Sequence, residues 1–248
     1  MKENVCFLNC FLLYPEFLFR NGQTYRIPKI LPFLKKNKPS IIGLAEVFRG
    51  FCSQMKSEAM KHGYEFVYYN DGYIQNSGLM FLYNPDKWSC LQHTKDTFVH
   101  YTGSDRLANK GFMLLKMLYK KNGKVVYFLL THLNANQYSS QKTENVQIKQ
   151  LQQIKNFLLK HGIHNHSLVL MGDFNIDYNR SFLKNELDTL GHTGSPYEFT
   201  TNLWSKEGYQ VLDYIILHNV DGNTKTEVLR YKNNLLSDHN PILRKINL

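Results

Sequence analysis

The sequence predicts a single α/β domain built on mixed β-sheets, and three observations support this fold class. Short apolar runs rich in β-branched and aromatic residues recur along the whole chain. Amphipathic helical patterns lie between some of these runs, and an Asn122-Gly123 turn joins two of them as a hairpin. No internal repeat, low-complexity tract or linker-like stretch interrupts the 248 residues, so we expect one domain over residues 1–248.

The apolar runs are the predicted strands. Several are apolar at consecutive positions, as expected of strands that are covered on both faces. A hairpin combined with strand–helix–strand units favours mixed sheets over a doubly wound parallel sheet. In chain order, the predicted strands are residues 5–13, 41–47, 64–69, 77–83, 111–119, 124–132, 167–175, 211–217 and 241–246.

The clearest predicted helix covers residues 143–162, where leucine and isoleucine side chains repeat at helical spacing. Thr143 is expected to cap its start, and Gly162 is expected to close its end. Residues 25–39 carry a second helical pattern that contains proline, and residues 52–63 carry a weaker third one.

The chain is basic, with 30 Lys and Arg against 20 Asp and Glu and a formal charge of +10. A positive surface attracts nucleic acid, acidic lipid headgroups or phosphorylated small molecules, and the charge does not choose among them. Lysines kept for solubility explain the charge equally well.

Four cysteines are too few for a disulfide scaffold in a chain of this size. If Cys6 and Cys10 lie on one strand, they are about 13 Å apart at ~3.3 Å per residue, which is too far for a disulfide. Reduced thiols are therefore expected, and they fit an intracellular chain.

No membrane-spanning segment is predicted, because no run reaches about 18 uninterrupted apolar residues. The apolar run "VCFLNCFLL" does not indicate a signal peptide, because Asn9 interrupts it, only Lys2 precedes it with Glu3 beside it, and no small-residue cleavage site follows. We expect membrane contact, if any, to be peripheral. The compartment stays open between the cytoplasm and export by a signal-independent route.

Acids, amides and histidines occur at or beside the ends of several predicted strands. Taken singly, each has a bland explanation, such as a solvated strand end, a turn or a histidine that caps the strand. Their repetition indicates instead that separate strands deliver reactive groups to one centre. These residues are Asn9, Glu46, His132, Asp173, Asn175, Asp213, Asp238 and His239.

The types of these residues indicate metal-assisted chemistry. Oxygen donors without a cysteine cluster suit Mg²⁺ or Ca²⁺ better than structural zinc. A histidine near a carboxylate can serve as a general base near neutral pH. Asp213 lies within an apolar run, where a carboxylate is costly unless it is paired. Together these features describe phosphodiester hydrolysis.

The chain resembles the endonuclease/exonuclease/phosphatase superfamily, which includes the DNase I-like nucleases. The resemblance implies a four-layer α/β/β/α sandwich, in which two mixed sheets pack together and helices cover the outside. The matching stretches run in order through most of the chain: Asn9, "AEV" with Glu46, "SGLMFLY", "THLNA" with His132, "GDFNID", "LDYI" and "SDHNPI".

Within that superfamily the chain looks most like the Mg²⁺-dependent neutral sphingomyelinases of the sphingomyelinase C branch. "RLANKGFMLLKM", "NGQTYRIPKILPFL" and "HTGSPYEFTTNLW" carry this narrower resemblance. Two departures stand out. Gln147 occupies a helical position where many relatives have arginine, and a short "LRYKNNLL" replaces the aromatic hairpin with which secreted bacterial members engage membranes.

The resemblance also implies roles for individual residues. His239 would be the general base, Asp213 its partner, and His132 a donor to the phosphoryl oxygens. Residues two apart in an extended chain point to the same side, so Asp173 and Asn175 are expected to face one ligand together. The resemblance implies that they orient water and phosphate. Asn9, Glu46 and Asp238 would bind the metal, which is Mg²⁺ or, as a substitute, Mn²⁺ or another divalent cation. Asn109 and Lys110 would bind the substrate.

The function implied is hydrolysis of sphingomyelin, or a related choline phospholipid, to ceramide and phosphocholine at a membrane surface, by a protein expected to be monomeric. A nuclease of the same fold is the first alternative, which the positive charge would suit. A phosphoinositide or other phosphoester phosphatase is the second. A binding module that has lost its chemistry is a third reading, which the complete set of acids and histidines opposes.

Overall fold

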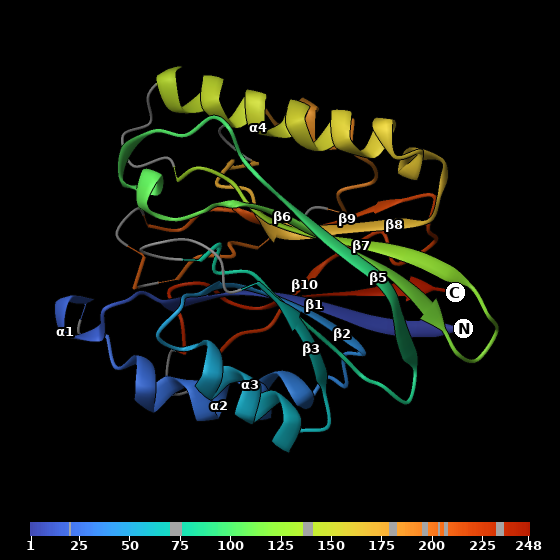
Figure 1. The fold of residues 1–248 in the computed structure, drawn as a ribbon, viewed down its shortest axis with the longest axis horizontal. Coiled ribbons are helices and arrows are strands. Elements are labelled where there is room, and N and C mark those ends of the chain that lie inside the picture. The colour runs from blue at the N-terminus through green and yellow to red at the C-terminus, as the bar shows by residue number, and fades with distance from the viewer. Residues whose placement is uncertain are drawn as a thin grey trace.

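Two β-sheets pack face to face, and helices cover their outer surfaces (Figure 1). The computed structural model describes residues 1–19, 21–69, 76–135, 141–178, 183–194, 198–202, 204–205, 208–231 and 236–248. Helices α2 and α3 lie on one outer face, and α4 lies on the other (Figure 1). This arrangement confirms the predicted four-layer sandwich.

The first sheet has six strands in the order β10-β11-β1-β2-β4-β3. Strands β1 and β2 run parallel, and the other neighbours in this sheet are antiparallel. The strands are β1 (Lys2–Leu12), β2 (Ile41–Val47), β3 (Glu65–Tyr68), β4 (Met80–Tyr83), β10 (Glu227–Val228) and β11 (Ile242–Asn247).

The second sheet has five strands in the order β5-β6-β7-β8-β9, with β7 and β8 parallel. The predicted hairpin is confirmed, since β6 and β7 are antiparallel neighbours around Gly123, which has a φ of 74°. The strands are β5 (Trp88–Thr97), β6 (Gly111–Tyr119), β7 (Val125–His132), β8 (Leu168–Asp173) and β9 (Asp213–His218).

Two strands were not predicted, and both lie at the edge of a sheet. Strand β5 is largely polar, "WSCLQHTKDT", and most of its residues are partly or fully exposed. Strand β10 has only two residues. An edge strand needs neither a continuous apolar run nor strict alternation, so apolar patterning does not detect it.

The helices are α1 (Glu16–Phe19), α2 (Gln23–Lys35), α3 (Cys52–Lys61), α4 (Gln141–Lys160) and α5 (Lys184–Asp188), with short 3₁₀ helices η1 (Gly103–Leu107) and η2 (Ile163–Asn165). The predicted cap at Thr143 is wrong, because α4 begins at Gln141 and buries Thr143 within its first turn. Gly162 does close α4, in the left-handed conformation with a φ of 66°. No helix within the described residues is long and apolar enough to cross a membrane.

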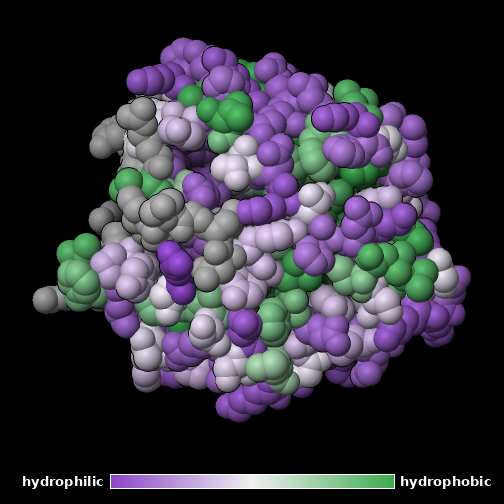
Figure 2. Space-filling view, viewed as in Figure 1, coloured by the Kyte–Doolittle hydropathy of each residue, from purple (hydrophilic) through white to green (hydrophobic). Residues whose placement is uncertain are grey.

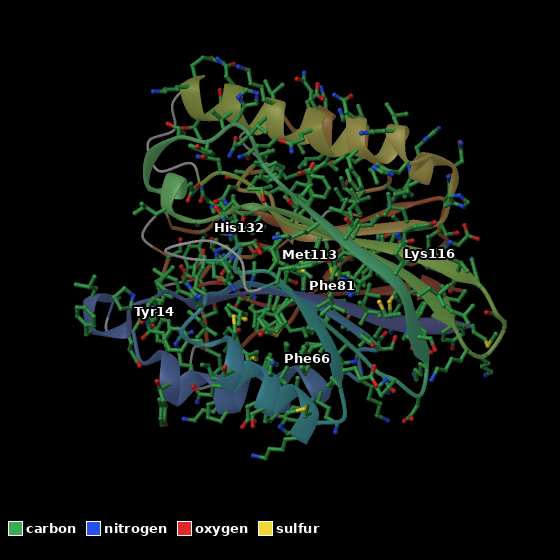
Figure 3. The ribbon with its side chains drawn as sticks, in the orientation of Figure 1. Tyr14, Phe66, Phe81, Met113, Lys116 and His132 are labelled. Atoms are coloured by element: carbon green, nitrogen blue, oxygen red, sulfur yellow. The ribbon has the colours of Figure 1, made fainter. Side chains whose placement is uncertain are left out.

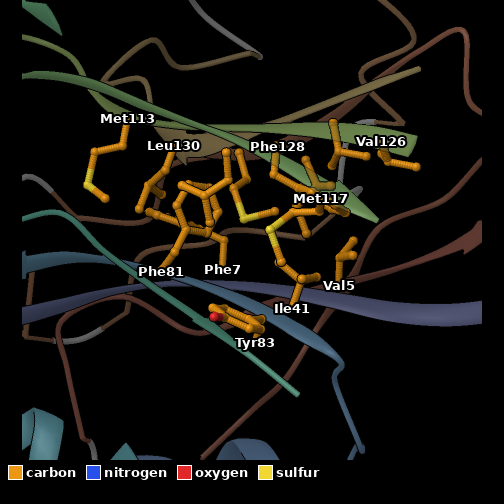
Figure 4. Close-up of a cluster of buried hydrophobic side chains, with 14 of the residues drawn as sticks. Val5, Phe7, Ile41, Phe81, Tyr83, Met113, Met117, Val126, Phe128 and Leu130 are labelled. Atoms are coloured by element: carbon orange, nitrogen blue, oxygen red, sulfur yellow. The ribbon is translucent and has the colours of Figure 1, made fainter. Parts of the chain in front are cut away.

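The main core lies between the sheets, where large apolar side chains from both inner faces interdigitate (Figure 4). The sheets approach closely at Gly43 on β2, because a Cβ at this position would lie 2.6 Å from Met171 Sδ on β8. All four cysteines are free thiols. This packing holds the two sheets in one relative position, so the ends of their central strands open onto a shared space. Labelled members of the core are Val5, Phe7, Ile41, Phe81, Tyr83, Met113, Met117, Val126, Phe128 and Leu130.

Candidate active site

Three of the predicted residues form one row across the second sheet. His132 on β7 pairs in register with Asp173 on β8, and Asp173 pairs with Asp213 on β9. Each residue is the last or first of its strand, and all three are buried. His132 lies toward the same end of the sandwich as Tyr14 (Figure 3). The register of the sheet therefore sets these side chains next to each other.

The first sheet contributes Asn9 from β1 and Glu46 from β2. Asn9 Nδ2 lies 3.1 Å from Glu46 Oε1 and 3.0 Å from Asp173 Oδ2, so this amide joins the two sheets. Its Oδ1 accepts a hydrogen bond from the Phe11 N–H at 3.1 Å. Because the NH₂ group faces the carboxylates, Asn9 positions both of them in this arrangement. Its predicted role at the metal stays a prediction.

The loop before β11 completes the centre from the C-terminal part of the chain. His239 Nδ1 lies 2.7 Å from Asp213 Oδ2, and His239 Nε2 lies 3.8 Å from Asp173 Oδ2. Ser237 Oγ donates to the Asn9 carbonyl oxygen at 2.6 Å, which fastens this loop to β1. The predicted pairing of Asp213 with His239 is thus present in the structure.

His132 and Lys110 form a second hydrogen-bonded group at the same centre. Lys110 Nζ lies 3.1 Å from His132 Nε2, 3.0 Å from Asp105 Oδ2 and 3.0 Å from the Leu133 carbonyl oxygen. His132 Nε2 lies 3.6 Å from Asp173 Oδ2. Lys110 is therefore a buried part of the site. Asn109 lies beside it, half-buried, on a small cavity of about 70 Å³.

Asn175 reaches the site differently from the prediction. Strand β8 ends at Asp173, and Asn175 has a left-handed backbone with a φ of 52°, so the two side chains do not share a face by strand alternation. The Asn175 N–H donates to Asp173 Oδ1 at 2.9 Å, and its Nδ2 donates to the Leu133 carbonyl oxygen at 3.1 Å. Gln147 donates to the Asn175 carbonyl oxygen at 2.9 Å. A neutral amide thus holds the backbone of this turn.

Burial and the crowding of carboxylates shift the pKa values at this centre. Burial and, second to it, the negative charge of Asp238 raise the pKa of Glu46 to about 7. Burial also raises the pKa of Asp173 to about 6, although the charge of His239 opposes the shift. The pKa of Asp238 is raised as well, again chiefly by burial. In the absence of a cation, these carboxylates therefore resist being ionised together.

The two histidines shift in opposite directions. Burial lowers the pKa of His132 well below its usual value, and the charges of Lys110 and His239 lower it further. Burial also opposes a charge on His239, but the carboxylates of Asp213, Asp238 and Asp173 together outweigh it and hold this pKa well above its usual value. His132 is therefore a neutral ring, whereas His239 readily holds a proton.

The carboxylates fit a divalent cation beside Glu46. Glu46 Oε2 is buried and has no hydrogen-bond partner among the described residues, and Asp238 adds a second negative charge nearby. Donor atoms of Asp173, Asp213 and His239 also lie within 4.8 Å of one another. A cation between Asp213 and His239 would have to break their 2.7 Å hydrogen bond, so Glu46 and Asp238 are the better ligands.

Sequence reasoning missed Arg26, a buried residue of α2. Its guanidinium donates to the carbonyl oxygens of Cys10 at 2.8 Å and of Phe11 and Leu236 at 2.5 Å each. It thereby ties the chain after Asn9 to the loop that carries His239. A charged residue on the apolar face of a predicted helix was the available signal, because such a residue needs internal partners.

The fold and these residues place the chain in a known class. The model of the endonuclease/exonuclease/phosphatase family matches residues 21–239, so the chain belongs to this family. Among solved structures, sphingomyelinase C from Streptomyces griseocarneus superposes with a TM-score of 0.82 at 18% identity, over 100% of both chains. A Staphylococcus aureus beta toxin mutant with bound magnesium ions superposes with a TM-score of 0.81 at 19% identity, over 98% of this chain and 99% of that one.

The chain is also similar in sequence to curated sphingomyelinase C proteins. The chain is 28% identical to sphingomyelinase C of Listeria ivanovii over 178 residues, which cover 64% of this chain and 51% of the relative. It is 32% identical to sphingomyelinase C of Bacillus cereus over 152 residues, which cover 52% of this chain and 45% of the relative. These alignments thus span about half the length of the relatives.

Proposed function

We propose that this chain is a Mg²⁺-dependent phosphodiesterase that hydrolyses sphingomyelin, or a related choline phospholipid, to ceramide and phosphocholine. The observation that carries the proposal is the buried Asp213–His239 pair, whose 2.7 Å hydrogen bond lies beside the carboxylate of Asp173 and close to Glu46. The sphingomyelinase C relatives support the choice of lipid.

His239 is the proposed general base. Asp213 holds the Nδ1 proton and leaves Nε2 directed toward the centre, 3.8 Å from Asp173 Oδ2. Nε2 takes a proton from water while the water oxygen bonds to phosphorus and the bond from phosphorus to the ceramide oxygen breaks. Asp173 accepts a hydrogen bond from the attacking water, and the Asn175 N–H fixes the direction of that carboxylate.

Lys110 and His132 are the proposed donors to the phosphoryl oxygens. All three Lys110 protons are engaged in this structure, so a phosphoryl oxygen replaces His132 Nε2 as one acceptor. The neutral ring of His132 can then carry its proton on Nε2 and donate to the same group. These donors face the charge that grows on the phosphoryl oxygens in the transition state.

Glu46 and Asp238 would hold Mg²⁺, and Asn9 would keep Glu46 in place through the 3.1 Å contact. When bound, the cation supplies positive charge for the phosphoryl group and the departing alkoxide. The raised pKa of Glu46 reflects the electrostatic cost that such a cation would remove.

A substrate panel tests the proposal. Sphingomyelin, lysophospholipid, phosphoinositide, DNA and RNA are incubated with the protein in Mg²⁺ and, in parallel, in EDTA. We expect release of phosphocholine from sphingomyelin with Mg²⁺ only, and no release by His239→Ala. Nicking of DNA or RNA without phosphocholine release would favour the nuclease, which the formal charge of +10 suits. Release of inorganic phosphate from phosphoinositide alone would favour the phosphatase.

A further inference from the structure

Several large apolar side chains are exposed on α1 and the start of α2. Phe17 is 70% exposed, Leu18 66% and Tyr25 68%, and we call these three residues the apolar knob. Helix α1 projects beyond the first sheet at its left end (Figure 1), and a hydrophobic group protrudes at that edge of the surface (Figure 2). Large exposed apolar groups that cluster in this way usually mark a surface that binds a protein, a membrane or a ligand.

The knob is held by the residues around it. The Glu16 carboxylate accepts hydrogen bonds from the Thr24 N–H at 3.2 Å and from Thr24 Oγ1 at 2.7 Å, which fastens α1 to the start of α2. The Tyr14 ring packs edge-on against Phe51, with ring centroids 6.3 Å apart. It also fills the space above Gly50, where a Cβ would lie 2.2 Å from Tyr14 Cδ2. The apolar side chains therefore point outward from an anchored base.

The knob lies near the rim of the candidate active site, by which we mean the chain segments that flank Asn9 and His239. Arg26, one residue after Tyr25, donates to the carbonyl oxygens of Phe11 and Leu236, and its guanidinium lies 6.0 Å from the ring of Trp204. Trp204 is 43% exposed. The Trp204 backbone N–H donates to Asn202 Oδ1 at 3.0 Å, and the Asn202 backbone N–H donates to the Asp238 carbonyl oxygen at 2.9 Å. Trp204 therefore lies on this rim too.

The chemistry of this rim matches the interface of a bilayer. Phe and Leu side chains suit the acyl region, whereas Tyr and Trp rings suit the headgroup region. Lys29 Nζ lies 2.9 Å from the centroid of the Tyr25 ring, so a positive charge that can attract lipid phosphates borders the knob. The one acid of α1, Glu16, is already engaged by Thr24.

We propose that the apolar knob, with Trp204 and Lys29, docks the protein on a phospholipid bilayer with the active-site rim facing the membrane. The inference rests on the proposed function, because this orientation brings the active site to its substrate only if that substrate is a membrane lipid. Docking itself requires only the bilayer, so it can be measured without sphingomyelin and without catalysis.

The test is sedimentation with phosphatidylcholine vesicles that contain no sphingomyelin. We expect the unaltered protein and His239→Ala to bind, and Phe17→Ser/Leu18→Ser to bind about tenfold or more weakly. The matched control is Met60→Ser/Leu159→Ser, which removes exposed apolar side chains from α3 and α4. Hydrolysis of the soluble diester bis-p-nitrophenyl phosphate by the knob variant is expected to be unchanged.

Unaltered vesicle binding by the knob variant would overturn the proposal, as would an equal loss in the control variant. A dimer of the unaltered protein that the knob variant abolishes would assign the knob to a second copy of the chain and also overturn it. Vesicle binding that depends on the knob, together with DNA cleavage and no phosphocholine release, would support docking while refuting the proposed lipid substrate.

Discussion

Replacing Asp213 by asparagine removes one charge from the centre and changes little in shape. Asp213 Oδ2 lies 2.7 Å from His239 Nδ1, and at an effective dielectric constant of about 20 a full ion pair at this distance is worth about 6 kcal/mol. The imidazolium that forms when His239 takes the proton from water loses that attraction. An asparagine NH₂ group facing Nδ1 would in addition favour the wrong tautomer. We expect kcat to fall by about 10²–10⁴-fold.

The pH profile gives an independent readout of the same change. A general base works when it is unprotonated, so activity rises as the pH increases through the pKa of His239. Burial lowers this pKa, but the neighbouring carboxylates, with Asp213 foremost, together outweigh burial and keep it raised. In Asp213→Asn the rising limb of kcat should therefore move to lower pH.

The assay is hydrolysis of bis-p-nitrophenyl phosphate at saturating Mg²⁺ across a series of pH values. Asp177→Asn is the matched control, because it neutralises another buried carboxylate near the start of β9. It should retain most of the activity and an unmoved limb. If Asp213→Asn keeps full activity and the original pH profile, the pairing does not activate His239 and the reasoning fails.

Three further predictions concern stability. Because burial raises the folded-state pKa of Glu46 to about 7, the metal-free protein should lose on the order of 3 kcal/mol of stability as the pH rises from about 4.5 to about 7. Glu46→Gln should flatten this loss and abolish the Mg²⁺-induced rise in Tm. If the variant in EDTA loses stability with pH as steeply as the parent, the prediction is wrong. Lys110→Met removes the cation paired with the mostly buried carboxylate of Asp105, which keeps the hydrogen bond from the Ala135 N–H, and should cost about 3–5 kcal/mol in urea unfolding. Part of the loss should be recovered in Lys110→Met/Asp105→Asn, and no recovery would refute the pairing. Gly172→Ala places a Cβ 2.2 Å from the Thr131 carbonyl oxygen and should lower both Tm and activity, since it pushes β7 from β8; a variant as stable as the parent would show that the strands do not approach so closely.

Much of this fold could be predicted from local patterning. Continuous apolar runs identified the central strands because a strand buried on both faces carries few polar residues. The same logic explains what was missed. Strand β5 is a polar edge strand, and α4 begins before Thr143, so neither feature leaves an apolar signal at its boundary. Helix ends and sheet edges depend on partners that lie elsewhere in the chain.

The candidate site divides in the same way. The sequence identified the acids and histidines, because such residues at the ends of apolar runs are costly without a purpose. It did not determine that Asn9 presents its NH₂ group to Glu46 and Asp173, or that Asn175 leaves the extended conformation. Those features depend on hydrogen bonds between residues far apart in sequence.

The sequence by itself thus determined which residues are available for chemistry and which strands carry them. Only the tertiary structure decided that His132, Asp173 and Asp213 form one row, and that His239 reaches that row from 26 residues after Asp213. The physical reason is that strand register and the stacking of two sheets come from packing across the whole core. No local stretch of sequence contains that information.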